Sequence, residues 1–523
     1  MCEQLMISKQ RPNAIQLHHF PKAVAILLGL LFYTFGGQPW IEGVSATACS
    51  VVKPKSAVDA TAAVDVFQLE KSAVASLSFR HCVWTAVNVQ FIATSDVDDL
   101  SVSFHNCTLL RGSLWFQVVK LARLTIVVEN SLFRCDGPPA FMASIIMTND
   151  ELKVKSGYLF VVIAFGSLNN VNVTVSNSTI AVETPASDGS TTGAVALAFS
   201  TPSVGQRIEN FFVRVNQSRV IAYALDRPPV PASHILSIVG FVRVENYEVH
   251  LHEATLVARA SLSYISTGFT GQARVMYNRA SVSHAVVALH SRSVMGAEST
   301  VGCSAGVGWL AYDGALRNIR VIVDGASMIR VTTPLDADAF AWRAPLNAPS
   351  SQINSSYVFD EGSTVDVTSG KSATVFSQVA AGDSVHHNVD GFRFALLGSS
   401  KIHVRAATDL QLLSWPLAGT ASSLTVNDFV VTVASGSSIN VTGSTTVCCL
   451  CLIAPSAQLS ASVVVKNVNV TIGDGSAVSV NGSTEAQFIS VYSKGSATTG
   501  APTIQLWKVA VDVTSGSTID ARA

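Results

Sequence analysis

The chain has 523 residues, of which 48% are hydrophobic and only 13% are charged, about half the charged fraction of an ordinary soluble domain. This much apolar material excludes a disordered chain. The 34 basic and 35 acidic residues give a formal net charge of -1 and are scattered singly, so we expect no nucleic acid partner, which would need a basic stripe to neutralise phosphates.

The N-terminal 48 residues have the three parts of a secretory signal. Basic residues precede an apolar stretch of 13 residues that starts at Ala23, and Ala46-Thr47-Ala48 follows as a cleavage site. At 1.5 Å per residue the stretch spans roughly 20 Å, short of the roughly 30 Å hydrocarbon core of a membrane. We expect cleavage near Ala48; an uncleaved anchor that uses residues up to Trp40 is the alternative.

This signal sets the expected domains and location. We divide the chain into a signal peptide or signal anchor at 1–48, a cap or linker at 49–70 and a repeat domain at 71–523. The protein is expected to be extracellular or at the cell surface through the secretory pathway, or membrane-anchored if the segment is kept. Membrane contact is expected only through that segment.

Eight Asn-x-Ser/Thr sequons support a secretory route and are candidates for glycosylation. Their number exceeds chance only modestly, and the frequent Asn-Val-Thr triplets of the repeat offer another explanation. The eight asparagines are Asn106, Asn172, Asn177, Asn216, Asn354, Asn440, Asn469 and Asn481.

Internal repeats are the strongest signal in the chain. The segments NIRVIVDGASMIRV from Asn318, DFVVTVASGSSINV from Asp428 and NVNVTIGDGSAVSV from Asn467 match position by position, and each reads as strand, tight turn, strand. GFRFALLGSSKIHV from Gly391 and KVAVDVTSGSTIDA from Lys508 follow the same pattern. Earlier copies, such as NVNVTVSNSTIAV, lose one residue in the turn.

The first apolar residue after each turn marks the period. From Ile329 onward the markers are 36, 37, 37, 39 and 41 residues apart, whereas LSFRHCVW, VSFHNCTL and VVENSLFR, at Leu77, Val102 and Val127, repeat at about 25. We expect the gaps at 133–180 and 282–329 to hold a unit without the motif, or an insertion. The markers are Ile180, Val220, Leu256, Val282, Ile329, Val365, Ile402, Ile439, Val478 and Ile519.

The pattern inside one unit predicts an all-β fold. Val468, Val470 and Ile472 alternate with polar residues, which places them on one face of a strand. A third β-rich run, AQFISVYS from Ala486, follows the strand-turn-strand segment. Three strands per unit predict a right-handed parallel β-helix, a β-solenoid, with a β-propeller of four-stranded blades as the alternative.

Candidate catalytic and metal-binding residues are few. Asp98 and Asp99 are the only adjacent aspartates; we interpret them as a solvated turn, because neighbours on a strand face opposite ways and glycoside hydrolysis needs two carboxyl groups on one face. The segment Asp-Val-Thr-Ser-Gly begins at Asp366 and again at Asp512, and we interpret both copies as turns of the repeat. We expect no catalytic residue, no metal and no cofactor.

Two histidine pairs are candidate metal ligands. His250 and His252 share one strand face, and His386 and His387 are expected in a polar loop. Two imidazoles without a nearby carboxylate or thiolate make a poor zinc site. We therefore interpret them as exposed histidines.

The cysteines that remain after the signal permit disulfides in an oxidising compartment. Cys82 and Cys107 occupy equivalent repeat positions, so a disulfide between them and a stack of free thiols are both possible. Alternation places Cys449 and Cys451 on one face and Cys448 on the other. We interpret these three as buried small hydrophobes, with pairing to distant cysteines as the alternative.

With its signal and its Ser/Val-rich repeats such as NVNVTIGDGSAVSV and DFVVTVASGSSINV, the chain resembles large protozoan surface proteins of the dispersed gene family type, which have parallel β-helix (pectin-lyase-like) repeats. The resemblance extends from about residue 70 to the end and brings no catalytic motif. Those proteins are typically longer and end in membrane spans, so we expect a truncated or secreted member.

The resemblance implies a secreted or cell-surface glycoprotein with an adhesive or shielding role. Two hypotheses follow. The first is a non-enzymatic protein that binds an extracellular carbohydrate or protein ligand. The second is a polysaccharide lyase or hydrolase.

Overall fold

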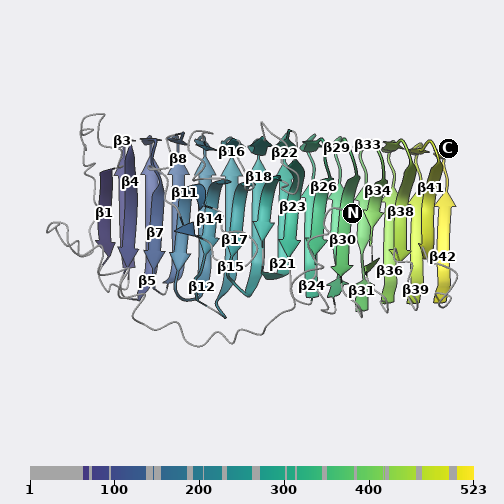
Figure 1. Ribbon diagram of the computed structural model, residues 1–523, viewed down its shortest axis with the longest axis horizontal. Helices are drawn as coiled ribbons and strands as arrows, with labels where there is room; N and C mark the ends of the chain where they lie inside the picture. Colours follow the sequence, from purple (N-terminus) through teal and green to yellow (C-terminus); the bar gives the residue numbers. More distant parts are fainter. Residues whose placement is uncertain are drawn as a thin grey trace, which may run out of the picture.

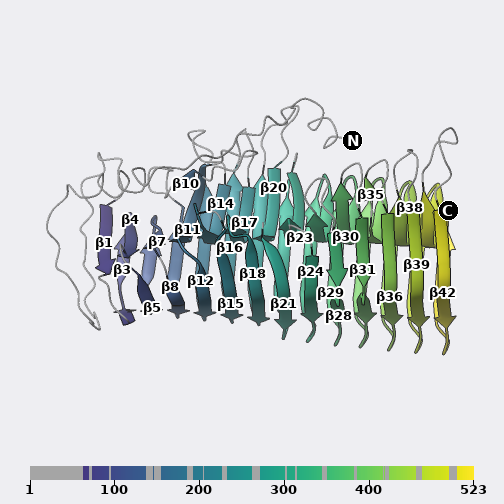
Figure 2. The same cartoon turned by 90° about the horizontal axis from the view of Figure 1, so that it is seen from below.

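Three parallel sheets run the length of the molecule and form a β-solenoid (Figures 1 and 2). The computed structural model describes residues 63–523 apart from 70–73, 94–95, 120, 137–144, 147–154, 185–192, 204, 226–231, 262–270, 279, 301–302, 312–314, 344–349, 382–385, 416, 419–422, 455–461 and 494–502. The regular secondary structure of these described ranges consists of β-strands alone. The predicted signal segment lies outside them.

Each coil passes through the three sheets in turn, which we call sheets A, B and C. Sheet C has thirteen strands, one for each coil of the described residues. Their bounds are β3 Val83–Thr85, β6 Thr108–Leu110, β9 Leu132–Cys135, β13 Thr179–Thr184, β16 Arg219–Leu225, β19 Thr255–Ser261, β22 Val294–Ser299, β25 Met328–Thr333, β29 Thr364–Ser369, β33 Lys401–Ala406, β37 Ser438–Gly443, β40 Ala477–Asn481 and β43 Thr518–Arg522.

Sheet A opens each coil. Its strands are β1 Ala63–Leu69, β4 Val87–Ala93, β7 Leu114–Val118, β11 Lys155–Ala164, β14 Gly193–Ser200, β17 Ala232–Val239, β20 Gly271–Asn278, β23 Cys303–Ala311, β26 Ala337–Arg343, β30 Ala373–Ala381, β34 Leu410–Ser414, β38 Thr446–Ala454 and β41 Glu485–Ser493. The short β10 Ile145–Ile146 pairs antiparallel with β11, and β35 Leu417–Ala418 pairs with β30.

Sheet B contains the middle strand of each coil. Its strands are β2 Val74–Arg80, β5 Val97–His105, β8 Leu121–Glu129, β12 Leu168–Ser176, β15 Arg207–Asn216, β18 Arg243–His252, β21 Ser281–His290, β24 Ala315–Val323, β27 Ser350–Ile353, β28 Ser356–Phe359, β31 His386–Asp390, β32 Arg393–Leu396, β36 Ser423–Val433, β39 Ser462–Ile472 and β42 Thr503–Val513. In two coils the middle strand is split into two shorter strands, β27 and β28 in one and β31 and β32 in the next.

The predicted fold is confirmed: the chain is an all-β parallel solenoid with three strands per coil, and not a propeller. Each strand pairs in parallel with its counterpart one coil later, and this pairing joins successive coils into the stack. The first strand of the described residues, β1, begins at Ala63 and pairs with β4. The stack therefore includes part of the 49–70 segment that we expected to be a cap or linker.

Alternating side chains build the core. In β29 every second residue is buried, and Ile329, Val365 and Ile402 pair in register on successive coils. Aromatic rings stack in the same manner, as do Phe79 and Phe104 with centroids 5.3 Å apart. Because neighbouring strands lie about 4.8 Å apart, identical positions form ladders and no coil buries its inner face alone.

The register confirms nine of the ten marker residues and corrects one. Leu256 pairs with Met295, which pairs with Ile329, whereas Val282 lies in sheet B opposite Val244. No additional unit is therefore needed between 282 and 329. Near the N-terminus, Val102 pairs with Ile126, so the predicted alignment at Val127 was wrong by one residue.

The corner between sheets B and C is the tight turn of the repeat. In the first six coils one residue adopts a left-handed conformation, as Asn177 does at φ 48°; later coils use two, such as Ser435 and Gly436 at φ 58° and 69°. This confirms that the earlier turns lack one residue. Asparagine and glycine tolerate this region best, which explains the turn composition.

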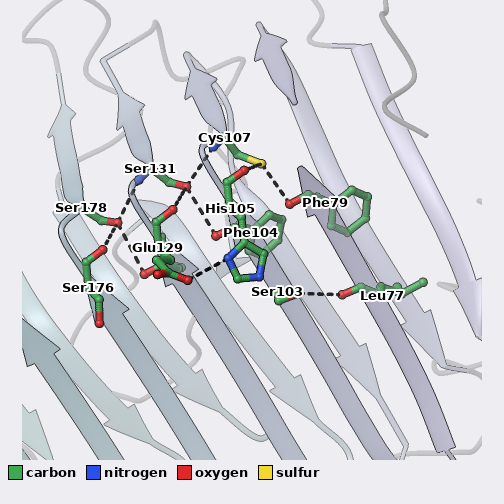
Figure 3. A network of polar contacts seen from close by, with 11 residues as sticks. Leu77, Phe79, Ser103, Phe104, His105, Cys107, Glu129, Ser131, Ser176 and Ser178 are labelled. Carbon is green, nitrogen blue, oxygen red and sulfur yellow. Dashed lines mark hydrogen bonds and ion pairs between the residues drawn. The ribbon is translucent and has the colours of Figure 1, made fainter. Parts of the chain in front are cut away.

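A serine ladder follows this corner. The main-chain N–H groups of Cys107 and Ser131 each donate to the serine hydroxyl one coil later at 3.0 Å (Figure 3). The N–H of Ser178 donates in the same way to the Ser218 hydroxyl, also at 3.0 Å. These serines are buried, so each hydroxyl satisfies an amide that water does not reach. Cys82 and Cys107 occupy the same position in the first two coils.

A second corner bends sheet B at the first residue of the predicted repeats from Asn246 onward. Asn246, Asn318 and Asn467 have φ between 48° and 55°. Their side chains bond along the stack: Asn246 Nδ2 donates to Asn210 Oδ1 at 2.8 Å. The repeat therefore begins at a bend and not within a straight strand.

Candidate binding surface

A shallow polar cleft of about 430 Å³ lies on the B–C corner of the fourth to sixth coils. Three left-handed residues, Asn177, Gln217 and Glu253, stand one above the other there, and Gln217 Nε2 donates to Glu253 Oε2 at 2.9 Å. Ser178, Thr179, Ser218 and Arg219 complete the lining. Its hydroxyl, amide and charged groups suit a hydroxyl-rich ligand.

All eight predicted glycosylation residues are described, and none is buried. Asn172 and Asn469 are exposed on sheet B strands, and Asn440 and Asn481 are partly exposed on sheet C strands. Asn106 and Asn177 lie at the corner between sheets B and C, Asn354 lies at the bend between β27 and β28 of sheet B, and Asn216 is the last residue of β15. Asn177 N–H donates to the carbonyl of Asn216, so two sequons meet on adjacent coils beside the cleft.

The adjacent aspartates lie in β5, so the expected turn at Asp98 and Asp99 was wrong. Asp99 pairs with Arg123 of the next coil, and this bond lowers the pKa of the Asp99 carboxyl. An ionised carboxylate held by arginine is not available as a general acid. Asp366 and Asp512 likewise lie in strands, β29 and β42, and not in turns.

The histidine pairs have different environments. His250 is partly exposed and contacts Glu248 of its own strand at 3.0 Å. His386 and His387 lie in strand β31, not in a loop. His387 points inward and is buried next to Ser350, and burial lowers its pKa to about 3.

The Ser350–His387 contact resembles a nucleophile and its base only in residue type. Both side chains are 2% exposed inside the solenoid. Serine catalysis needs a hydroxyl that the substrate can reach, and this one is inaccessible. We assign this pair to the core.

A polar row on the outer face of sheet A was missed by the sequence reasoning. His234, Arg274, Gly306, Asp338 and Thr374 pair in register on five successive coils. Arg274 reaches over Gly306 to Asp338, with Nη1 3.7 Å from Oδ2. Asp338 also accepts a hydrogen bond from Thr374 Oγ1 at 2.6 Å.

Glycine is required in the middle of this row. A Cβ on Gly306 would lie 2.0 Å from Arg274 Nη1 and 2.8 Å from the Asp338 carbonyl. A glycine inside a strand often marks such a close approach, which is the signal that the sequence offered. The space above Gly306 thus holds the guanidinium.

Burial separates most of this row from solvent. Arg274 is 3% exposed, and His234 stacks on Tyr277 with ring centroids 4.5 Å apart. Burial, and secondarily the charge of Arg274, lowers the pKa of His234 to about 3. His234 is therefore neutral at physiological pH.

The cysteines correct two expectations. Cys82 is disulfide-bonded, but not to Cys107, which is a free buried thiol. Cys448 and Cys451 form a disulfide, with Cα atoms 6.0 Å apart, while Cys449 packs in the core. Cys449 and Leu450 both pack in the core, and Cys448 and Cys451 form a separate buried cluster apart from it.

Neither a metal-binding cluster nor a membrane-spanning helix is found in the part of the chain that the structure describes. No group of three or more His, Cys, Asp or Glu side chains there is placed to hold a metal ion. No helix among these residues has the length and hydropathy of a membrane span.

Comparison with protein-family models, with curated proteins and with solved structures finds no match for this chain.

Proposed function

We propose that this protein is a non-enzymatic secreted or cell-surface repeat glycoprotein with an adhesive or coat role, which binds carbohydrate or protein along its solenoid. The observation that carries the proposal is the chemistry of the outer faces of sheets B and C. There the alternation leaves hydroxyl and amide side chains facing outward, as Asn172, Thr174 and Ser176 do in β12. Such groups exchange hydrogen bonds with sugars and with peptide groups.

The disposition of charged groups supports the same proposal. Many carboxylates on these faces are held by arginine, as Glu298 is by Arg259 at 2.9 Å. In the described residues of the sheet A polar row, Asp338 is the one carboxylate. Glycoside hydrolysis requires two carboxyl groups about 5 to 9.5 Å apart.

A polysaccharide lyase or hydrolase remains the second candidate because His234, Arg274 and Asp338 share one face. The two functions are separated by incubating the secreted protein with a panel of linear polysaccharides. Binding without new reducing or unsaturated ends supports the adhesive function. Release of such ends, and its loss in Asp338→Asn, would replace the proposal with the enzyme.

The proposed location has its own test. The mature N-terminus and the membrane partitioning of the native protein are measured together. A soluble protein that starts near Cys49 means secretion. An intact Met1 in the membrane fraction means an anchor, and a cytosolic protein without glycans contradicts the surface role.

A further inference from the structure

Strand β33 carries three basic side chains on one outward face. Lys401 and Arg405 are exposed and His403 is partly exposed, while Ile402 and Val404 between them are buried in the core. In the sequence these charges are separated by apolar residues and look scattered. The period of two brings them into one line, with about 6.7 Å between neighbours.

The cations of this face lack the partners that other arginines of sheet C have. Arg134, Arg259 and Arg522 form ion pairs with Asp136, Glu298 and Asp520 at 2.7–2.9 Å. Among the described residues, Lys401 and Arg405 form no ion pair, and neither does Arg330 two coils earlier. Unpaired, solvated cations on a rigid strand are available to an anionic ligand at little cost in reorganisation.

The flanking strands supply neutral hydrogen-bonding groups. In register with β33, strand β29 presents Thr364, Asp366 and Thr368, and strand β37 presents Ser438, Asn440 and Thr442. Asp366 is the single carboxylate that β29, β33 and β37 present outward, against the two cations Lys401 and Arg405. Arg330 of the preceding strand β25 pairs in register with Asp366 and adds a third cation beside it. The net charge is positive, although the whole chain has a formal net charge of -1.

We propose that this face of β29, β33 and β37, called here the cationic stripe, binds a linear acidic polysaccharide. The inference rests on the proposed function and names its ligand class and site. The arginine fork matches carboxylate and sulfate groups, and the hydroxyl and amide groups alongside match sugar hydroxyls. Apart from the imidazole of His403, the outward positions of these three strands carry no aromatic ring on which a nucleic acid base would stack, which favours polysaccharide over single-stranded nucleic acid.

The test measures affinity for polygalacturonate, dextran sulfate, neutral dextran and single-stranded DNA at several salt concentrations. Wild type should bind an acidic polysaccharide and lose affinity with salt, and neutral dextran should bind far more weakly. The carboxylated and sulfated probes decide which anion is preferred. K401M/R405M should lose about tenfold in affinity per cation removed.

The matched control is R317M/R320M, which removes two exposed arginines from β24 of sheet B. R317M/R320M changes the net charge of the protein by as much as K401M/R405M does. It should nevertheless change affinity by less than about twofold, because its two arginines lie outside the cationic stripe. Arg405→Lys should give an intermediate loss, because the charge remains and the fork is gone. Asn440 pairs in register with His403 and is a sequon residue, so all variants are also measured in an N440Q background.

Equal affinity of wild type and K401M/R405M in both backgrounds, or an equal loss in the sheet B control, would overturn the site. Stripe-dependent binding of DNA without polysaccharide binding would overturn the ligand class. Binding of polysaccharide that ignores the stripe leaves the adhesive function standing. Cleavage of the probes refutes the adhesive function but not the location of the stripe.

Discussion

The hydroxyl of Ser131 accepts a hydrogen bond from the main-chain N–H of Cys107 at 3.0 Å, although the two residues belong to different coils. The same Ser131 donates its N–H to Ser178 one coil later. Each serine is therefore both acceptor and donor, and the ladder links coils at a corner where strand pairing ends (Figure 3). Removing one hydroxyl leaves a buried amide without a partner.

Ser178→Ala should lower stability by about 1–3 kcal/mol, because the N–H of Ser131 loses its acceptor away from water. Thermal unfolding and protease resistance of the folded protein measure the change. The control is Ser103→Ala, whose hydroxyl is partly exposed and bonds the Leu77 carbonyl at 3.5 Å. It should change stability by less than about 0.5 kcal/mol, and equal effects would contradict a special role for the ladder.

Asn246→Val should destabilise more than Asn246→Gly. Asn246 has φ 48°, where a β-branched residue costs about 1–2 kcal/mol, and its side chain bonds Asn210 at 2.8 Å. Glycine keeps the backbone and loses only the ladder bond. Thermal midpoints rank the two variants, and equal losses would show that backbone conformation does not limit this bend.

Gly306→Ala should destabilise the solenoid by about 1–3 kcal/mol through overpacking, since the new methyl would meet Arg274. In a double-mutant cycle, Arg274→Ala should recover part of this loss because the guanidinium leaves the space. Strict additivity of the two changes would mean that the guanidinium does not occupy it.

Acid should weaken the fold through its buried histidines. Burial, with a smaller effect of Arg274 at His234, lowers the pKa of His234 and His387 from 6.5 to about 3. The unfolded chain takes up these protons near pH 6.5, so their contribution is complete above that pH and is lost as the pH falls towards 3. Each should add a slope of about 1.4 kcal/mol per pH unit in this window.

Urea unfolding of wild type, His234→Gln, His387→Gln and the double variant between about pH 7 and about pH 5 checks this slope. Each single variant should be less pH-sensitive than wild type, and the double variant least. Unchanged slopes in all three would refute the assignment of neutral buried imidazoles.

Alkylation should separate the cysteines of β38. In the unfolded chain Cys449 should be alkylated directly, whereas Cys448 and Cys451 should react only after reduction; in the folded protein Cys449 should stay unlabelled, because burial raises its pKa to about 12. Mass spectrometry of the peptide checks this order. C448S/C451S should cost about 2 kcal/mol or less, because so short a loop has little closure entropy to restore.

Sequence periodicity predicted the parallel solenoid because the inward ladder depends on alternation within one strand, as at Val468, Val470 and Ile472. It misplaced Val282 because the seventh coil turns at Ser291 and Arg292 without glycine, and its marker is Met295. A two-residue turn without glycine leaves no sequence signal. The spacing between the markers on either side did not reveal this turn either.

The surface rows were beyond single-segment reasoning for a different reason. His234, Arg274 and Asp338 lie 40 and 64 residues apart along the chain and meet only once each coil is in register. The polar neighbours of His387 predict a loop there, whereas in the structure the core at that level holds the polar Ser350 beside it. The Lys401–Arg405 line needed only the period of two and was open to prediction.

The B–C corner lengthens from one left-handed residue at Glu253 to two at Ser291 and Arg292, yet sheets B and C stay in register across this change. The corner accommodates an inserted residue without changing the register of either sheet. Insertions and deletions there are tolerated by the stack, whereas one residue gained inside a strand would exchange its buried and exposed faces. Variation can accumulate at this edge while the exposed rows keep their spacing.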